Sequence, residues 1–233
     1  MTELEHPPVE PAAPEVLAVD VGGSHVKMLL NGEIERRRFV SGPELTPGKM
    51  VKGVLDQTTD WKYGAVSVGV PAVVLGDRVV HEPVNLGDGW VGFDFDAAFG
   101  TPIKVLNDAA MQAFGSYAGG RMLFLGLGTG LGSTMIVDGI IEPMELGHLP
   151  YRKGTYEDYV GERGRIRRGK KRWAKAVHEV IELLSAALEP EYVVLGGGNA
   201  KLLHELPQNV RLGHNEAAFL GGFKLWAPTI RTR

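Results

Sequence analysis

The chain contains the same arrangement of predicted strands around a glycine-rich turn twice. In the first copy "VLAVD" runs into Gly22-Gly23-Ser24 and "HVKMLL" follows; in the second, "RMLFLGLGTG" is followed by "GSTMIVDG". A third short strand, helices and further strands come after each pair. Glycine lets the backbone approach an anion closely, and backbone N–H groups in such turns can point at it. Two lobes of this kind would direct two turns at one cleft, which suits a ligand with phosphates at its centre.

Other phosphate-binding glycine motifs fit the second turn poorly. A dinucleotide fingerprint needs G-x-G-x-x-G between a strand and a helix, whereas here glycines stand at 126, 128, 130 and 132 and a strand follows. A Walker-type loop is absent, because "GPELTPGKM" has the wrong spacing and a Met where Ser or Thr should hold magnesium. Taken alone, each turn is also compatible with a tight β-turn that binds nothing.

Composition excludes several functional classes. The chain has 233 residues, 44% of them hydrophobic, which is enough for a sizeable core. A net charge of −3 argues against an electrostatic nucleic-acid binder, and the lack of cysteine excludes disulfides, thiolate metal sites and a cysteine nucleophile. No apolar run approaches the ~18 residues of a membrane helix. Residues 1–15 are Pro-rich and lack the apolar region of a signal peptide, so we expect a disordered tail and a cytoplasmic location.

Two adjacent polar residues end a predicted strand in the middle of the chain. "IKVL" predicts a strand that stops at Asn107-Asp108, and "AAMQAFGSYA" predicts the helix that begins there. A carboxylate at this point can accept the proton of a substrate hydroxyl. Asp is also a favoured helix N-cap, which is the alternative interpretation of Asp108. Asp20, which ends the first strand beside the first glycine turn, has a similar alternative as a turn-forming residue.

Five motifs in order carry a resemblance to a known family. They are "DVGGSHVK", "NDAA", "LGTGLGS", "ELGH" and "VVLGGGNAK", and together they span nearly the whole chain after the tail. The chain thereby resembles the sugar kinases of the ROK family, within the actin-like/hexokinase ATPase superfold. Within that family it is most similar to the polyphosphate glucokinases, which also have a Lys placed as Lys27 is after Ser24 and a segment like "VNLGDGW".

The resemblance implies an α/β, two-lobed actin-like/hexokinase ATPase (ribonuclease H-like) fold. Residues 16–108 would form the N-terminal lobe, which would bind the sugar and contain the first phosphate turn. Residues 109–233 would form the C-terminal lobe, with the second phosphate turn and the nucleotide side, and the last helix would return to the N-terminal lobe. The implied activity is transfer of a phosphoryl group from ATP and/or polyphosphate to the 6-hydroxyl of glucose or a close hexose.

The resemblance also implies roles for individual residues. Asp108 would be the catalytic base, and Asp20 would position Mg²⁺, through water, since Mg²⁺ keeps much of its hydration. Read without the resemblance, His148 is an ordinary loop histidine and Glu157 a solvated acid at a helix start. The implied sugar ligands are Asn85, Asn107, Asp108, Glu145, His148 and Glu157. The implied phosphate and nucleotide ligands are Asp20, Gly22, Gly23, Ser24, Lys27, Gly128, Thr129, Gly130, Gly132, Gly196, Gly197 and Gly198.

A strongly basic segment bears on the phosphoryl donor. Residues 162–175, "ERGRIRRGKKRWAK", contain eight Lys and Arg residues against one Glu in a net-acidic chain. Such a run can hold a long polyanion such as polyphosphate, and its alternative is a solvated helix face. The donor therefore stays open between ATP and polyphosphate. Most other ROK members hold a structural zinc through a Cys-rich loop, so a Cys-free chain is expected to lack that zinc.

One functional alternative comes from a different class. Sugar-sensing repressors of the same family carry a helix-turn-helix domain before the first strand, and the roughly fifteen residues present here are too few for three helices. A catalytically weak sugar-binding or sensor protein of the family remains the alternative. The expected partners are a hexose and the phosphoryl donor, with no nucleic acid and no membrane, and a homodimer is left open.

Overall fold

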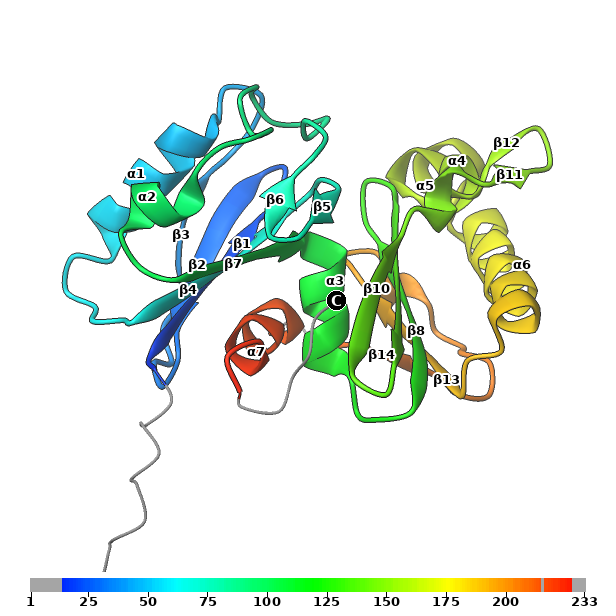
Figure 1. Ribbon diagram of the computed structural model, residues 1–233. Helices are drawn as coiled ribbons and strands as arrows, with labels where there is room; N and C mark the ends of the chain where they lie inside the picture. The colour runs from blue at the N-terminus through cyan, green and yellow to red at the C-terminus, as the bar shows by residue number, and fades with distance from the viewer. Residues whose placement is uncertain (1–13, 215, 228–233) are drawn as a thin grey trace, which may run out of the picture.

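Two five-stranded sheets form the frame of the molecule, one in each lobe (Figure 1). The computed structural model describes residues 14–214 and 216–227, so the tail expected at residues 1–15 lies almost wholly outside the described part. The first sheet has the order β3-β2-β1-β4-β7 and the second the order β10-β9-β8-β13-β14. The strands are β1 (Val16–Val21), β2 (His25–Leu30), β3 (Arg37–Val40), β4 (Ala65–Val70) and β7 (Ile103–Asn107) in the first sheet, and β8 (Arg121–Leu127), β9 (Leu131–Val137), β10 (Ile140–Met144), β13 (Tyr192–Gly196) and β14 (Val210–Leu212) in the second.

The two sheets have the same topology. In each, the first three strands form an antiparallel meander and the last two lie parallel to the first strand. The repeat seen in the sequence is therefore one topology used twice, and the predicted two-lobed α/β fold is confirmed. The segment "EIERRRFV" predicts a strand over residues 33–40, but β3 begins only at Arg37, and residues 33–36 lie outside it and are exposed.

Strand register gathers the polar residues at one edge of the first sheet. In the parallel pairs, Asp20 of β1 lies beside Gly69 of β4, and Val70 of β4 lies beside Asn107 of β7. The carboxyl ends of these three strands therefore lie at the same edge, where ligands bind in open α/β sheets. In the second sheet, Gly126 of β8 lies beside Gly196 of β13, so the second and third glycine turns are also neighbours.

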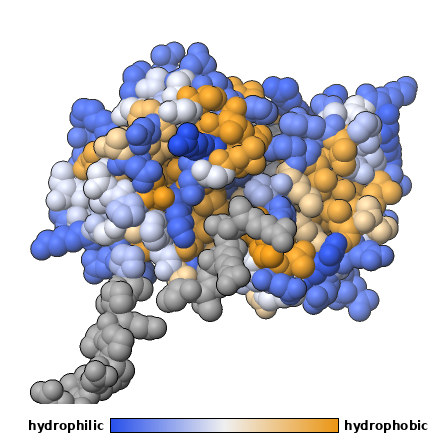
Figure 2. Space-filling view, in the orientation of Figure 1, coloured by the Kyte–Doolittle hydropathy of each residue, from blue (hydrophilic) through white to orange (hydrophobic). Residues whose placement is uncertain are grey.

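Helices cover both sheets and complete two cores. The first core includes Met50 and Trp90, and the second includes Trp173, whose indole N–H donates to the carbonyl of Val160 at 2.6 Å. No helix in the described part of the chain is long and apolar enough to cross a membrane. Polar side chains cover most of the periphery in Figure 2. The helices are α1 (Pro47–Gln57), α2 (Phe95–Phe99), α3 (Asp108–Ser116), α4 (Tyr156–Val160), α5 (Glu162–Arg168), α6 (Lys170–Leu188), α7 (Ala217–Lys224) and the 3₁₀ turns η1 (Leu146–His148) and η2 (Ala200–Leu202), with short hairpins β5 (Val74–Leu75)–β6 (Arg78–Val79) and β11 (Pro150–Tyr151)–β12 (Gly154–Thr155).

The last helix, α7, crosses α3 between the two lobes (Figure 1). It also packs on the first sheet, where Phe219 contacts Ala18 and Leu29 and the hydroxyl of Ser67 donates to the carbonyl of Gly222 at 2.8 Å. The crossing is close because glycines lie at it. A Cβ on Gly115 of α3 would lie 1.8 Å from the carbonyl oxygen of Ala217. The two helices therefore meet backbone to backbone.

We expect Gly115→Ala to destabilise the protein by about 3 kcal/mol or more, because the added methyl overlaps backbone that cannot move aside. For a chain of this size that lowers Tm by roughly 6–12 °C, measurable by differential scanning calorimetry. Gly48→Ala is the control, since Gly48 is exposed in α1 and a Cβ added there would have no neighbouring atom within 4 Å. Ala there should be neutral or stabilising by up to about 1 kcal/mol. Equal Tm values for the two variants would contradict the close crossing.

Candidate active site

Asp108 is the first residue of α3, but it is not the helix cap. The N-cap is Asn107, whose side-chain oxygen accepts from the backbone N–H of Ala110 at 3.1 Å and whose amide donates to the carbonyl of Ala72 at 3.1 Å. The capping alternative for Asp108 is therefore wrong, because its neighbour caps the helix. Both polar ends of Asn107, an expected sugar ligand, are occupied by backbone groups in this structure.

The carboxyl group of Asp108 has an environment suited to proton transfer at neutral pH. Burial between the lobes, and then the nearby charge of Asp20, raise the pKa of Asp108 to about 7, and the charge of Glu145 acts in the same direction. Oδ1 accepts from the backbone N–H of Ala109 at 2.8 Å, while Oδ2 makes no hydrogen bond within the described residues. A general base works best when its pKa lies near the working pH, so Asp108 can accept a proton through its free oxygen.

Asp20 and Lys27 form an ion pair beside the first glycine turn. They are directly opposite in the β1–β2 pair, and Lys27 Nζ lies 3.1 Å from Asp20 Oδ2. The turn between them is closed by a hydrogen bond from the N–H of Gly22 to the carbonyl of His25 at 3.0 Å. Gly23 and Ser24 at its tip are exposed. An exposed backbone turn next to a lysine is a suitable site for phosphate oxygens.

Hydrogen bonds from α5 and from the third turn hold the carbonyl groups of the second glycine turn. The carbonyls of Gly128 and Thr129 both accept from the N–H of Glu162, at 3.0 and 3.1 Å, and the Asn199 side-chain amide donates to the Gly128 carbonyl at 3.3 Å. Because these carbonyls are tied to α5 and to the third turn, the opposite side of the turn is left for a ligand. Thr129 at its tip is exposed. The arrangement preorganises a short backbone segment for anion binding.

The third glycine turn packs directly against the second. Gly197 has φ of +79°, and a Cβ there would lie 2.5 Å from the carbonyl oxygen of Leu127. Another residue of this turn, Asn199, donates its backbone N–H to the same carbonyl at 3.0 Å. Only glycine meets both requirements at position 197 without strain. Gly197 and Gly198 are exposed, so the turn is open for a flat group to lie on it.

Sequence reasoning missed the two side chains that brace the second turn, Glu162 and Asn199. Asn199 Nδ2 donates to Glu162 Oε2 at 2.8 Å, and Arg165 Nε donates to the same carboxylate at 3.0 Å. In the sequence, Glu162 is merely the one acid in a basic run, and Asn199 the end of a glycine motif. Because they are far apart in the chain, no local spacing could have paired them.

The expected sugar ligands divide between the two lobes. Glu145 immediately precedes η1 and His148 is its last residue, with His148 Nδ1 3.9 Å from Glu145 Oε2, and both side chains are more than half exposed. Glu157 of α4 lies against the second turn, since a Cβ on Gly130 would be 2.5 Å from its Oε2. Asn85 lies against the first turn, where a Cβ on Gly23 would be 3.7 Å from its Cβ. Of these residues, Glu145 is linked to Asp108 because its charge raises the pKa of Asp108. No hydrogen bond within the described residues joins His148, Glu157 or Asn85 to Asp108.

The residues present fit a magnesium ion that is shared with a phosphate ligand. Within residues 14–214 and 216–227, no group of three His, Asp or Glu side chains is placed to hold a metal by itself. Asp20 keeps Oδ1 free of hydrogen bonds in the described structure while Lys27 contacts Oδ2. Mg²⁺ in kinases is commonly bound by one or two carboxylates together with substrate phosphates and water. Asp20 satisfies that requirement beside the first turn.

The basic segment forms α5 and the start of α6, next to the second turn. Half of its cations have partners: Arg165 pairs with Glu162, Arg167 donates to the Asp158 carbonyl at 3.0 Å, the Arg168 guanidinium lies 4.2 Å from the Tyr159 ring centre, and Lys170 contacts His204. The other cations are exposed and have no hydrogen bond or ion pair to another described residue. They are Arg163, Lys171, Arg172 and Lys175.

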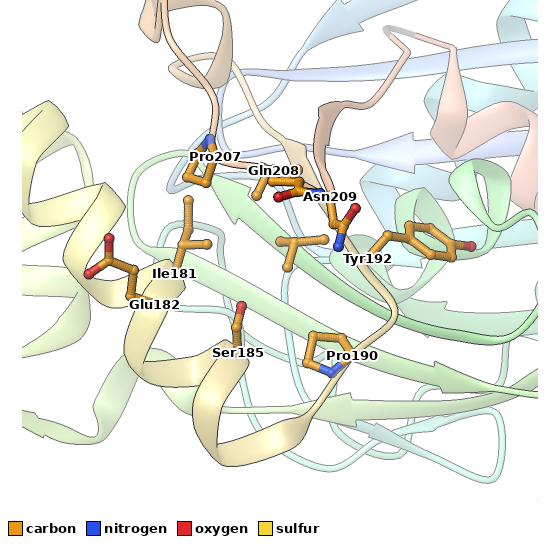
Figure 3. Close-up of a pocket in the computed structure, with 10 residues that line it drawn as sticks. Ile181, Glu182, Ser185, Pro190, Tyr192, Pro207, Gln208 and Asn209 are labelled. Carbon is orange, nitrogen blue, oxygen red and sulfur yellow. The ribbon is translucent and has the colours of Figure 1, made fainter.

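A separate cavity of about 210 Å³ lies at the opposite end of the second sheet (Figure 3). Its walls come from the C-terminal half of α6 and from the segments that begin β13 and β14, and they include Glu182, Tyr192 and Asn209. None of the expected site residues lines it. Because β13 runs from Tyr192 to Gly196, this cavity and the third glycine turn are at opposite ends of one strand.

Comparison with known proteins identifies the family. The model of the ROK family matches residues 16–164, which is more than half of the chain. The chain belongs to the ROK family. It is 27% identical over 202 residues to the polyphosphate glucokinase of Mycobacterium leprae, an alignment that covers 77% of this chain and 62% of that protein. The chain thus spans less than two thirds of this relative's length.

Two solved structures of the ROK group have the same fold. The inorganic polyphosphate/ATP-glucomannokinase of Arthrobacter sp. strain KM superposes with a TM-score of 0.76 at 26% identity, covering 91% of this chain and 98% of that one. A ROK family glucokinase from Streptomyces griseus, solved with glucose and AMPPNP, superposes with a TM-score of 0.73 at 17% identity, covering 91% and 99%. The chain therefore has the actin-like ATPase fold of ROK sugar kinases.

Proposed function

We propose that this ROK family protein transfers a phosphoryl group from ATP and/or polyphosphate to the 6-hydroxyl of glucose or a closely related hexose. The observation that carries the proposal is the carboxyl group of Asp108, which has a pKa of about 7, is influenced by the charge of Asp20 beside the first glycine turn, and keeps Oδ2 free of hydrogen bonds within the described residues. The names of the mycobacterial and Arthrobacter relatives support the choice of sugar and of donors.

In this proposal each lobe has its own task. Residues 16–108 contribute the first phosphate turn, Asp20, Lys27, Asn85 and Asp108. Residues 109–233 contribute the second and third turns and the acids near η1 and α4. The oxygen of the sugar 6-hydroxyl attacks the terminal phosphorus of the donor while Asp108 accepts the hydroxyl proton. The bond from that phosphorus to the bridging oxygen breaks, and the shortened donor leaves with the bridging oxygen.

The remaining groups stabilise charge and orient the substrates. Backbone N–H groups of the two turns, with the hydroxyls of Ser24 and Thr129, would solvate the donor phosphates. Asp20 would hold Mg²⁺ together with those phosphates, and the bound ion would neutralise charge that develops on them. Glu145, His148, Glu157, Asn85 and Asn107 would bind the sugar hydroxyls; for Asn107 this requires it to exchange a backbone partner.

A panel of donors and sugars tests the proposal. Purified protein is incubated with Mg²⁺ and either ATP or long-chain polyphosphate, each with glucose, mannose and N-acetylmannosamine, and the sugar phosphate is measured directly. We expect glucose 6-phosphate with at least one donor. Tight glucose binding by calorimetry without product from any donor would instead support the alternative of a sugar-binding sensor.

We expect Glu157→Gln to weaken glucose binding about 10- to 100-fold, since a charge-assisted hydrogen bond is worth about 1.5–3 kcal/mol. His148→Ala should have a smaller effect, because the His148 side chain is 67% exposed and water can replace it. Isothermal titration with glucose measures both, and neither variant should lower Tm in the absence of sugar by more than a few degrees. Glu182→Gln, in the distant cavity wall, is the control. Unchanged affinity in Glu157→Gln would remove Glu157 from the pocket.

A further inference from the structure

One buried hydroxyl fixes the backbone on both sides of Glu145. Ser133 lies on β9 directly opposite Met144, the last residue of β10, and it is 2% exposed. Its hydroxyl donates to the carbonyl of Met144 at 2.7 Å and accepts from the N–H of Leu146 at 3.1 Å. Met144 and Leu146 are the two chain neighbours of Glu145, so a single side chain closes a ring around this residue.

The ring holds Glu145 in a conformation that neither β10 nor η1 supplies. Its φ and ψ are −107° and 47°, outside both strand and helix. Its side chain is 54% exposed, and its one ion-pair partner among the described residues is His148 at 3.9 Å. Side-chain contacts therefore do little to place the carboxylate. Its position follows from the backbone, and the backbone is held by Ser133.

A second contact fixes the chain just beyond Glu145. Gly147 lies so close to β9 that a Cβ there would be 2.8 Å from the carbonyl oxygen of Leu131. The turn at η1 is thus docked on β9 at Leu131 and at Ser133. Because β9 also forms one side of the second glycine turn, the same strand positions both that turn and Glu145, the expected sugar ligand.

We propose that Ser133 is a positioning residue for the sugar site, acting through Glu145. This inference rests on the proposed function. Ser133 contacts neither substrate; it sets where the Glu145 carboxylate stands, and removing its hydroxyl lets the turn at 144–146 relax. The expected consequence is weaker sugar binding with unchanged donor binding.

The neighbouring residue provides a matched control. Thr134 is fully buried on the same strand, and its hydroxyl has no hydrogen-bond partner within the described residues. Thr134→Val removes a hydroxyl of equal burial from the same strand while preserving side-chain shape. A general sensitivity of β9 to hydroxyl loss would affect both variants, whereas the positioning role affects Ser133 alone.

The test is a double-mutant cycle in the full-length protein with glucose and the donor that the wild type uses best. Ser133→Ala should raise the KM for glucose about 10-fold, the scale of coupling between contacting residues, with the donor KM within twofold. Thr134→Val should leave both KM values within twofold of wild type. In a Glu145→Gln background, Ser133→Ala should add less than a twofold change, because the group through which it acts is already gone.

Each contrary result has a distinct meaning. A 10-fold rise in the glucose KM that persists in the Glu145→Gln background would overturn the proposal, as would a glucose KM in Ser133→Ala equal to that of Thr134→Val. If Ser133→Ala does not fold, the same cycle is run with Ser133→Cys, whose thiol is a weak donor and acceptor, and the same criteria apply. A wild type that phosphorylates no sugar refutes the proposed function instead, before any variant is compared.

Discussion

Asp108→Asn should reduce turnover by about 10²–10⁴-fold, the usual contribution of a positioned general base. The amide preserves size and hydrogen bonding to the Ala109 N–H in part, but it cannot accept the proton of the sugar hydroxyl. Glucose affinity should stay within a few-fold of wild type. Steady-state kinetics with glucose and calorimetric titration separate the two effects. Turnover within a few-fold of wild type would show that Asp108 is not the base.

The same substitution should also stabilise the protein at neutral and higher pH. The folded-state pKa of Asp108 is raised to about 7 from an ordinary value of 3.8, chiefly by burial and then by Asp20. The ionised form is therefore disfavoured in the folded state, and the wild type loses stability as pH rises from about 4 through 7. The Asn side chain is uncharged, so the variant has no ionised group to bury and does not lose this stability.

Measuring Tm of both proteins at two pH values tests whether wild-type stability falls as pH rises. The gain in Tm of Asp108→Asn over wild type should be larger at pH 8 than at pH 5. Asp56→Asn, at a 60% exposed position on α1, should show no such trend. In wild type, kcat/KM should rise with pH through an apparent pKa near 7, because Asp108 must be ionised to act as a base. An Asp108→Asn gain that is equal at both pH values would contradict burial of the carboxylate as its cause.

Neutralising Arg163, Lys171 and Arg172 together to Gln should raise the KM for long polyphosphate about 10-fold or more. These three side chains are exposed on α5 and α6 and make no hydrogen bond or ion pair within the described residues. Their charges are therefore available to a polyanion that extends out of the cleft from the second turn. The KM for ATP should stay within twofold, because in the proposed function the glycine turns hold most of the ATP molecule.

Salt dependence provides a second measurement of the same contacts. With nucleic acids, each cation–phosphate contact contributes about 0.7–0.9 to the slope of log affinity against log salt. If polyphosphate behaves in the same way, removing three contacts should reduce the magnitude of that slope by about 2–3. Lys49, Lys52 and Lys62 changed to Gln form the control, with the same charge change in the first lobe. Equal rises in the KM for ATP and polyphosphate would contradict an extended donor site. Failure of wild type to use polyphosphate while ATP works well would leave the basic segment as a solvated surface.

The structure changes which cations such an experiment should remove. From the sequence, Arg167, Arg168, Lys170 and Lys171 look equivalent to their neighbours. In the fold, Arg167 holds the Asp158 carbonyl and Arg168 stacks on Tyr159, so their loss would disturb α4 and α5 as well as charge. A charge run in a sequence shows how many cations there are, whereas contacts with other elements decide which of them are free.

The sequence alone determined the features that local patterns encode. The paired glycine turns, the strand that ends at Asn107-Asp108 and the helix that begins there follow from periodicity, turn residues and helix-forming composition, which act over a few neighbouring residues. Five ordered motifs were enough for the fold and the family, because a motif repeats its local geometry wherever it occurs. The repeat of one sheet topology in both lobes was visible for the same reason.

Only the tertiary structure decided the features that depend on distant residues. Whether Asn107 or Asp108 caps α3 is a choice between two good caps, and the carbonyl of Ala72 across the fold favours Asn107. The pKa of Asp108 depends on burial and on Asp20, which comes from another strand. The bracing of the second turn by Glu162 and Asn199, and of Glu145 by Ser133, joins residues whose spacing carries no periodic signal. Hydrogen bonds and desolvation act over a few ångströms of space, and the sequence records distance along the chain, so these interactions appear only once the chain is folded.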